Sequence, residues 1–272
     1  MTFIQSIILG IIQGASEFLP ISSSGHLVLA PYLFGWEINP QEAFVFDVLV
    51  QVATLTAVII YFWKDLVNIL KAFVKGIQDK KPFLDQNSRL GWYLILATIP
   101  AGAAALLFKD TFEDAFSNPK SAAIFLLVTS LLLLLGEFLG KRIRKLDSLT
   151  WLDALVIGIF QVLALFPGIS RSGSTITGGL LRKFDRSASA RFSFLMAVPI
   201  MSAAGVLALY DLAQSPDLMQ NIPVYFAGFI TAALVGYFAI RWFIVYLSKQ
   251  SLYLFAGYCG ILGLGFLVFY YL

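Results

Sequence analysis

The sequence has few charged residues, one cysteine and one histidine. Only 13% of its 272 residues are Asp, Glu, Lys or Arg, and 59% are hydrophobic. Soluble domains carry about 25% charged residues, so this composition excludes an ordinary cytosolic enzyme and a disordered chain. The net charge of +3 is too small for a protein whose main partner is a nucleic acid. The lone Cys259 excludes a disulfide framework and a cysteine-based metal site.

Lysine and arginine are absent before Lys64. A secretory signal peptide begins with a basic segment, so we do not expect one here. A helix needs about 20 mostly apolar residues to cross the hydrocarbon core of a bilayer. Six stretches meet this requirement, namely 43–63, 91–108, 121–139, 191–210, 223–247 and 251–272. The sequence therefore predicts an all-α polytopic membrane protein.

Two more apolar stretches, 3–35 and 151–181, are interrupted in the middle. The first contains Glu17, Pro20 and the run SSSGH at 22–26. The second contains Pro-Gly at 167–168, followed by SRSGST at 170–175. Backbone of this kind is tolerated at membrane depth only where it is buried in protein or lines a wet cavity. We therefore expect both stretches to be re-entrant helical hairpins.

Basic residues are concentrated in three segments between the expected spans. Segments 64–90, 140–150 and 182–191 hold six, four and four Lys or Arg, whereas 211–222 holds none. Cytoplasmic loops carry the Lys and Arg excess, so these three segments are expected inside. If these three segments lie inside, counting the spans along the chain places both ends of 151–181 on the inside. The same count places the exit of 3–35 outside, so this stretch is expected to enter from the outside. A full crossing by 3–35, with the N-terminus inside, is the alternative.

An internal repeat supports this arrangement. Residues 8–27 align with 156–175 at a constant offset of 148, with identities that include Gln13/Gln161, Ser22/Ser170 and Gly25/Gly173. We therefore predict one membrane domain over 1–272, with halves of approximately 1–140 and 151–272. Each half has one re-entrant hairpin and three transmembrane helices. An odd number of crossings places the halves in opposite orientations, which is the inverted repeat of secondary transporters.

Four reactive side chains lie in the two interrupted segments: Glu17, Ser23, His26 and Arg171. Ionisable groups within a membrane are costly, and each is by default a functional candidate. An arginine fork matches phosphate oxygens and stays charged when buried. A serine becomes a nucleophile when a nearby base takes its proton, and the lone histidine is a candidate base. If the hairpins meet, these groups form a site for a phosphate ester or a diphosphate.

Structural roles are the alternatives for the same residues. Glu17 and Arg171 would form an ion pair, His26 would be a core histidine, and isolated serines such as Ser22 and Ser174 would serve close helix packing.

Other polar residues of the spans are weaker candidates. Asp47 and Gln51 lie one turn apart and are expected to line the cavity or to brace a hairpin. Glu137, Asp153 and Arg241 lie near span ends, where charged side chains usually extend to the interface.

The stretches QGASEFLPISSSGH at 13–26 and PGISRSGST at 167–175 resemble motifs of the undecaprenyl-diphosphate phosphatase family, also called the bacitracin-resistance family. This resemblance covers essentially the whole chain. It implies an integral enzyme that hydrolyses undecaprenyl diphosphate, the lipid carrier of cell-wall synthesis, to undecaprenyl phosphate and inorganic phosphate. It also implies a homodimer among membrane lipids, a divalent cation (Mg²⁺ or Ca²⁺), and a site that faces the outer side of the bacterial cytoplasmic membrane. No nucleic acid is expected as a partner.

The resemblance also assigns roles by motif position. Glu17 and Ser23 would be catalytic, His26 an acid/base, and Arg171 a phosphate ligand. Gln13 replaces the first glutamate of the commonest motif, which leaves Glu17 and Gln13 as weak candidates for metal binding. The remaining phosphate-binding candidates are Ser24, Gly25, Ser170, Ser172 and Thr175.

Two questions stay open at this stage. Ser23 attacks the terminal phosphorus with help from His26, or a water molecule organised by Glu17 and His26 attacks directly. A polyprenyl-phosphate transporter, or flippase, would use the same anion site. A transporter needs neither a nucleophile nor an acid/base group, so Ser23 and His26 favour the enzyme.

Overall fold

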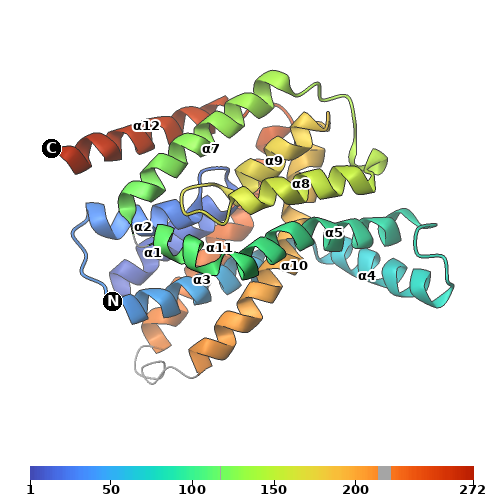
Figure 1. Cartoon of the computed structure of the whole chain (residues 1–272). Helices are drawn as coiled ribbons and strands as arrows, with labels where there is room; N and C mark the ends of the chain where they lie inside the picture. Colours follow the sequence, from blue (N-terminus) through green and yellow to red (C-terminus); the bar gives the residue numbers. More distant parts are fainter. Residues whose placement is uncertain (117, 214–221) are drawn as a thin grey trace.

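The computed structural model describes residues 1–116, 118–213 and 222–272, and all named elements in these ranges are helices (Figure 1). Six of the described helices are long and apolar enough to cross a membrane. They are α3 (Pro40–Tyr61), α5 (Gln86–Leu107), α7 (Pro119–Leu139), α10 (Arg186–Ala213), α11 (Ile222–Leu247) and α12 (Tyr253–Tyr271). The six helices correspond to the six predicted spans, which confirms the all-α polytopic class.

Two of these helices, α5 and α10, begin five residues earlier than predicted because aspartates cap them. Asp85 accepts hydrogen bonds from the N–H groups of Asn87 and Ser88, at 2.8 and 3.1 Å, so α5 begins at Gln86 instead of 91. Asp185 accepts one from the N–H of Ala188 at 2.7 Å. The prediction that 182–191 is a loop was therefore wrong, since α10 begins at Arg186.

Segment 64–90 is also not a simple loop. It contains most of α4 (Trp63–Gln78), an amphipathic helix that packs on α5. Ile69 is buried on its inner face, whereas Lys64, Lys71 and Lys75 are exposed. A second short helix, α6 (Lys109–Phe116), precedes α7. Charge counts find such segments but do not distinguish a helix from a loop.

Each interrupted segment forms two helices packed against each other across a turn. These are α1 (Phe3–Phe18) with α2 (Ser23–Leu33), and α8 (Trp151–Leu163) with α9 (Arg171–Leu181). The second helix of each pair begins at a serine cap: Ser22 and Ser170 accept hydrogen bonds from the N–H groups of Gly25 and Gly173, at 3.2 and 3.1 Å. The polar runs that interrupt the apolar stretches are therefore helix N-termini.

The two turns contact each other closely. A Cβ added to Gly25 would lie 3.1 Å from the Cα of Gly168, and one added to Gly173 would lie 3.4 Å from the Cβ of Pro20. Gly25 and Gly173 are paired by the 148-residue offset, and so are Pro20 and Gly168. Each turn therefore makes the same contact with the other.

Glycine is required at position 168 by conformation and by space. Its φ is +97°, and an added Cβ would lie 2.2 Å from the carbonyl oxygen of Ala122. Gly168→Ala is expected to destabilise the protein by at least about 1–3 kcal/mol, the usual range for overpacking. The apparent midpoint of thermal unfolding in detergent measures this effect. Gly102→Ala is the matched control, because nothing lies within 4 Å of its added Cβ. Equal midpoints for the two variants would contradict the expectation.

Two acidic residues near span ends are buried, contrary to prediction. The side chains of Glu137 and Asp153 have 0% exposure. Each carboxylate is held by two arginines, Glu137 by Arg142 and Arg186, and Asp153 by Arg144 and Arg182. Extension to the interface was predicted from position alone, whereas these ion pairs make burial favourable.

Thr150 adds to the pairing of Asp153. Its N–H and its hydroxyl donate to Asp153 Oδ2 at 2.9 and 2.7 Å. Both oxygens of this buried carboxylate therefore have hydrogen-bond partners.

Candidate active site

A cavity of about 160 Å³ lies where the two hairpin turns meet. Glu17, Ser22, Ser23 and Ser24 line it from the first hairpin, and Ser170 and Arg171 line it from the second. The remaining lining residues are Ser16, Gln51, Ala164, Ile169, Ile200, Met201 and Ala204. The structure thus brings together Glu17, Ser23 and Arg171, and Gln51 lines the cavity as expected.

Glu17 is the centre of the polar network. One carboxylate oxygen, Oε2, accepts hydrogen bonds from Ser23 Oγ at 2.5 Å and from Gln13 Nε2 at 3.1 Å. The other, Oε1, accepts one from Arg171 Nη2 at 2.9 Å. Ser23 and Arg171 occupy equivalent repeat positions. A single carboxylate therefore connects the first residue of α2 with the first residue of α9.

Arg171 has donors left for another anion. Its Nη1 donates to the carbonyl of Ser193 at 3.3 Å and its Nη2 to Glu17, and its side chain is 13% exposed. A guanidinium carries five N–H donors, and the others have no hydrogen-bond partner among the described residues. Because Arg171 lines the cavity, these donors are available to a phosphate group.

The serines of the two turns form matched pairs. The hydroxyls of Ser22 and Ser24 lie 3.2 Å apart, and those of Ser170 and Ser172 lie 3.1 Å apart. The N-termini of α2 and α9 carry partial positive charge, which favours an anion between them. The turns therefore add backbone dipoles to the charge of Arg171.

Three predicted phosphate ligands lie behind the cavity wall. Gly25 uses its N–H to bond Ser22, and Ser172 is fully buried and donates to the carbonyl of Leu19 at 3.2 Å. Thr175 is also buried and donates to the carbonyl of Arg171 at 2.7 Å. In this structure these residues hold the turns in place, and none of them is among the residues that line the cavity.

The ring of His26 is hydrogen-bonded to groups other than Ser23. Its Nδ1 lies 2.7 Å from the carbonyl oxygen of Ser22, and its Nε2 lies 2.7 Å from the hydroxyl of Tyr258. Its ring is stacked on that of Tyr258, with an interplanar angle of 4°. Both ring nitrogens are therefore engaged with groups other than the Ser23 hydroxyl, and His26 is not among the residues that line the cavity. The carboxylate of Glu17 is the basic group in contact with Ser23.

The residues around Glu17 do not fit a resident metal ion. Gln13 is buried, and its Oε1 has no partner among the described residues. Both oxygens of Glu17 already accept hydrogen bonds. The described residues contain no group of three or more His, Cys, Asp or Glu that could hold a metal. One carboxylate and one amide oxygen are too few ligands for a permanent Mg²⁺ or Ca²⁺ site.

Sequence reasoning missed some supporting residues. Thr129 of α7 donates to the carbonyl of Gly168 at 2.8 Å and accepts from the N–H of Ser170 at 2.9 Å. Gln13 Nε2 donates a hydrogen bond to the hydroxyl of Thr54 on α3, at 3.4 Å. A threonine within an apolar helix has no distinguishing pattern, so the sequence contains no signal for either contact.

These features define an integral membrane protein with a polar cavity between two helical hairpins, lined by Glu17, Arg171 and serines of both turns. The chain belongs to the BacA family: the family model, described as bacitracin resistance protein BacA, matches residues 6–265.

Curated relatives match over nearly their whole length. A protein of Moorella thermoacetica named undecaprenyl-diphosphatase is 42% identical over 258 residues, which covers 95% of this chain and 94% of the relative. Proteins with the same name from Chloroherpeton thalassium and Chlorobaculum parvum are 42% and 41% identical. These matches cover 97% and 98% of this chain, and 95% and 97% of the relatives.

Proposed function

We infer that this protein is a membrane phosphatase that hydrolyses undecaprenyl diphosphate to undecaprenyl phosphate and inorganic phosphate. This reaction recycles the lipid carrier of cell-wall synthesis and gives resistance to bacitracin. Family membership and the names of the relatives support the substrate. The observation that carries the chemistry is the contact of Glu17 with both Ser23 and Arg171. A transporter would need the anion site but no hydroxyl–carboxylate pair, so the flippase alternative is not favoured.

The proposed reaction begins when the terminal phosphate binds Arg171. Phosphate oxygens then compete with Glu17 for the guanidinium, and Glu17 becomes a better proton acceptor. Ser23 Oγ attacks the terminal phosphorus and transfers its proton to Glu17 Oε2. The bond from that phosphorus to the bridging oxygen breaks, and undecaprenyl phosphate leaves. Positioning and electrostatic stabilisation supply most of the catalysis in phosphoryl transfer.

Water completes the proposed cycle. It hydrolyses the phosphoserine at Ser23, releases inorganic phosphate and restores the hydroxyl. Direct attack by water organised by Glu17 is the competing pathway, and trapping of a phosphoserine distinguishes the two. The acid/base role of His26 stays a prediction, since its ring bonds Ser22 and Tyr258 in this structure.

A divalent cation is proposed as part of the substrate. Mg²⁺ keeps several of its waters and is usually bound through substrate phosphates with one or two carboxylates. The shortage of protein ligands around Glu17 supports this arrangement. The cation would therefore arrive and leave with the diphosphate.

Phosphate release by the purified protein in detergent tests the proposed function. Undecaprenyl diphosphate is supplied with Mg²⁺, with Ca²⁺, or with a chelator that removes both. Release of one phosphate per lipid, suppressed by the chelator and restored by the cation, is expected. Absence of release under all of these conditions would contradict the proposed activity.

An inverted repeat with two re-entrant hairpins is the proposed architecture. The reciprocal contacts Gly25–Gly168 and Gly173–Pro20 support it. So does the packing of α1 on α11 and of α8 on α5, since the repeat relates these two pairs. Each pair of helices approaches closely at a glycine, and the two glycines are paired by the repeat. A Cβ added to Gly10 would lie 2.7 Å from the carbonyl oxygen of Gly228 on α11, and one added to Gly158 would lie 2.4 Å from that of Ala97 on α5.

The homodimer implied by the family resemblance is likewise a proposal. Nothing lies within 4 Å of a Cβ added to Gly257 or Gly265 of α12. Small residues on an open helix face favour helix–helix packing in membranes. We place the dimer contact on this face of α12.

We propose that the cavity around Glu17 opens toward the outer side of the membrane. Ser24 lines the cavity, and Lys80 lies exposed in the basic segment 64–90. Under the proposed topology, the two positions lie on opposite sides of the membrane. In a Cys259→Ser background, Ser24→Cys is expected to react with a membrane-impermeant thiol reagent in intact cells. Lys80→Cys is expected to react only after the membrane is opened.

Ligand protection is the control for this labelling. Inorganic diphosphate should slow the reaction of Ser24→Cys, because both compete for the cavity. The Cys259→Ser background removes the one native cysteine of the sequence, so each variant carries a single thiol. Labelling of Lys80→Cys but not of Ser24→Cys in intact cells would reverse the proposed orientation.

A further inference from the structure

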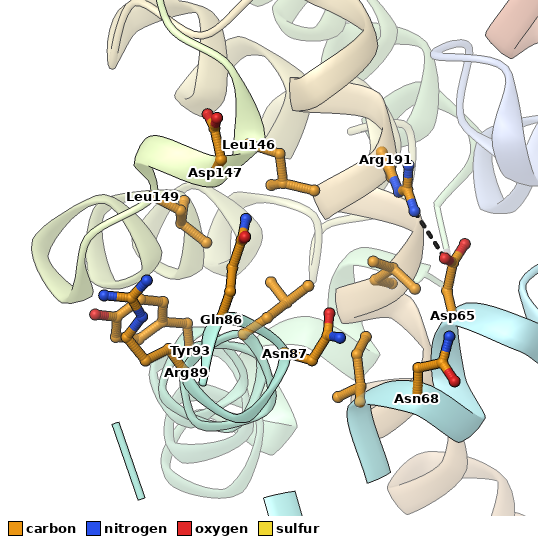
Figure 2. A pocket seen from close by; sticks show the side chains of 13 residues that line it. Asp65, Asn68, Gln86, Asn87, Arg89, Tyr93, Leu146, Asp147, Leu149 and Arg191 are labelled. Carbon is orange, nitrogen blue, oxygen red and sulfur yellow. Dashed lines mark hydrogen bonds and ion pairs between the residues drawn. The ribbon is translucent and has the colours of Figure 1, made fainter. Parts of the chain in front are cut away.

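A second cavity, of about 220 Å³, lies between α4, α5, α10 and the short 3₁₀ helix η1 (Leu146–Ser148), as Figure 2 shows. It has no lining residue in common with the cavity around Glu17. Its walls come from the basic segments 64–90 and 140–150 and from the start of α10. The proposed phosphatase reaction makes no use of it.

The charges of this cavity do not all neutralise one another. Arg191 Nη2 pairs with Asp65 Oδ1 at 2.7 Å (Figure 2). Arg89 on α5 and Asp147 on η1 also line the cavity, and within the described part of the chain neither side chain has an ion-pair partner. The cavity therefore offers one free cation and one free anion on different walls.

Side-chain amides add neutral donors and acceptors. Asn68, Gln86 and Asn87 line the same cavity, and no described residue hydrogen-bonds to their side chains. Figure 2 places Gln86 and Asn87 on the α5 wall and Asn68 on α4. The NH2 group of such an amide can donate to phosphate oxygens, and its oxygen can accept from an ammonium group.

An apolar groove of about 420 Å³ adjoins the polar cavity. The two share Ile69 and Leu195, and the groove is lined almost entirely by apolar side chains of α3, α4, α5 and α10. Trp63 and Leu70 of this groove are 60% and 63% exposed. A polar compartment next to an apolar one fits an amphiphile with a charged head and a hydrocarbon chain.

The position of α4 indicates that the amphiphile is a membrane lipid. Amphipathic helices with lysines on one face and Trp, Phe and Leu on the other lie at the membrane interface. Exposed tryptophan is also typical of that level. The polar cavity would then lie at the headgroup layer and the groove among the acyl chains.

We propose that this cavity and groove bind one molecule of phosphatidylethanolamine. Its phosphate contacts Arg89, its ammonium contacts Asp147, and one acyl chain lies in the groove between α4, α5 and α10. Phosphatidylglycerol lacks the cation for Asp147. Phosphatidylcholine has a cation but no N–H to donate.

Native mass spectrometry of the purified protein with equimolar phosphatidylethanolamine, phosphatidylglycerol and phosphatidylcholine tests this proposal. The wild-type protein is expected to retain one phosphatidylethanolamine in preference to the other two. Arg89→Gln and Asp147→Asn are each expected to weaken retention about tenfold, as when a hydrogen bond to a charged group is lost. The matched controls Lys80→Gln and Asp79→Asn, at exposed positions of the same basic segment, should retain it.

Three outcomes would overturn the proposal. Equal retention of phosphatidylglycerol would mean that the basic segments attract any anionic lipid. Equal competition by tail-free glycerophosphoethanolamine would mean that the groove binds no acyl chain. Unchanged retention by both cavity variants would place the lipid elsewhere. Arg89 and Asp147 are exposed, so both variants should fold and keep phosphatase activity in lipid-free detergent.

Discussion

Arg171→Lys is expected to lower the turnover of undecaprenyl diphosphate about 100-fold or more, the loss typical of removing a preorganised transition-state donor. The guanidinium contacts Glu17 and the carbonyl of Ser193 with two different nitrogens and keeps further donors for phosphate. Lysine keeps the charge, but its compact ammonium cannot replace the planar fork. Initial rates of phosphate release by the purified variant measure the effect.

Arg191→Lys is the matched control for this experiment. Arg191 also forms an ion pair with an acidic residue, at 2.7 Å, but its side chain is 49% exposed and lies outside the cavity around Glu17. Exposed ion pairs contribute little, so this variant should keep nearly full activity. A folded Arg171→Lys protein with near-normal turnover would contradict the proposed role of Arg171.

Ser23→Ala is expected to abolish hydrolysis. The hydroxyl of Ser23 lies 2.5 Å from Glu17 Oε2, which is the geometry of a nucleophile next to its base. Alanine removes the attacking oxygen and leaves the surrounding backbone unchanged. Rapid quenching of the wild-type enzyme with substrate labelled at the terminal phosphate should trap label on Ser23.

Ser22→Ala is the neighbouring control. Ser22 also lines the cavity, but its hydroxyl caps α2 through the N–H of Gly25 and does not contact Glu17. Loss of such a cap costs about 1 kcal/mol of stability, so the folded variant should keep a substantial fraction of activity. Substantial hydrolysis by Ser23→Ala would instead assign the attack to water.

The six spans could be predicted because apolar length is a property of the sequence alone. The bounds were less accurate, because Asp85 and Asp185 cap helices through hydrogen bonds that charge counts do not detect. The same limit applies to α4, whose lysines indicated a cytoplasmic loop. Glu137 and Asp153 were assigned to the interface from their position near span ends, because each also needs an arginine from 182–186, which is distant in sequence.

The grouping of Glu17, Ser23 and Arg171 could be anticipated from the repeated polar runs, since equivalent turns that meet bring equivalent positions together. The location of His26 could not. Its partner Tyr258 is 232 residues away along the chain, and nothing near position 258 indicates the contact. The short spacing in sequence suggested that the imidazole of His26 contacts the hydroxyl of Ser23. The contact with Tyr258 instead sets the direction of the ring.

The pairing of Glu137 sets an order on biosynthesis. Apart from Arg142, its partners are Arg186 and the N–H of Leu252, which follow it by 49 and 115 residues. A buried carboxylate without sufficient partners costs several kcal/mol. During synthesis, α7 therefore leaves the ribosome before Arg186 and Leu252, which supply two of the three groups that pair with Glu137. The first half therefore completes the pairing of Glu137 only with groups from α10 and the start of α12. A chain truncated before α10 would keep Arg142 as the partner of this buried acid but lack Arg186 and Leu252, and we expect it to be less stable in the membrane.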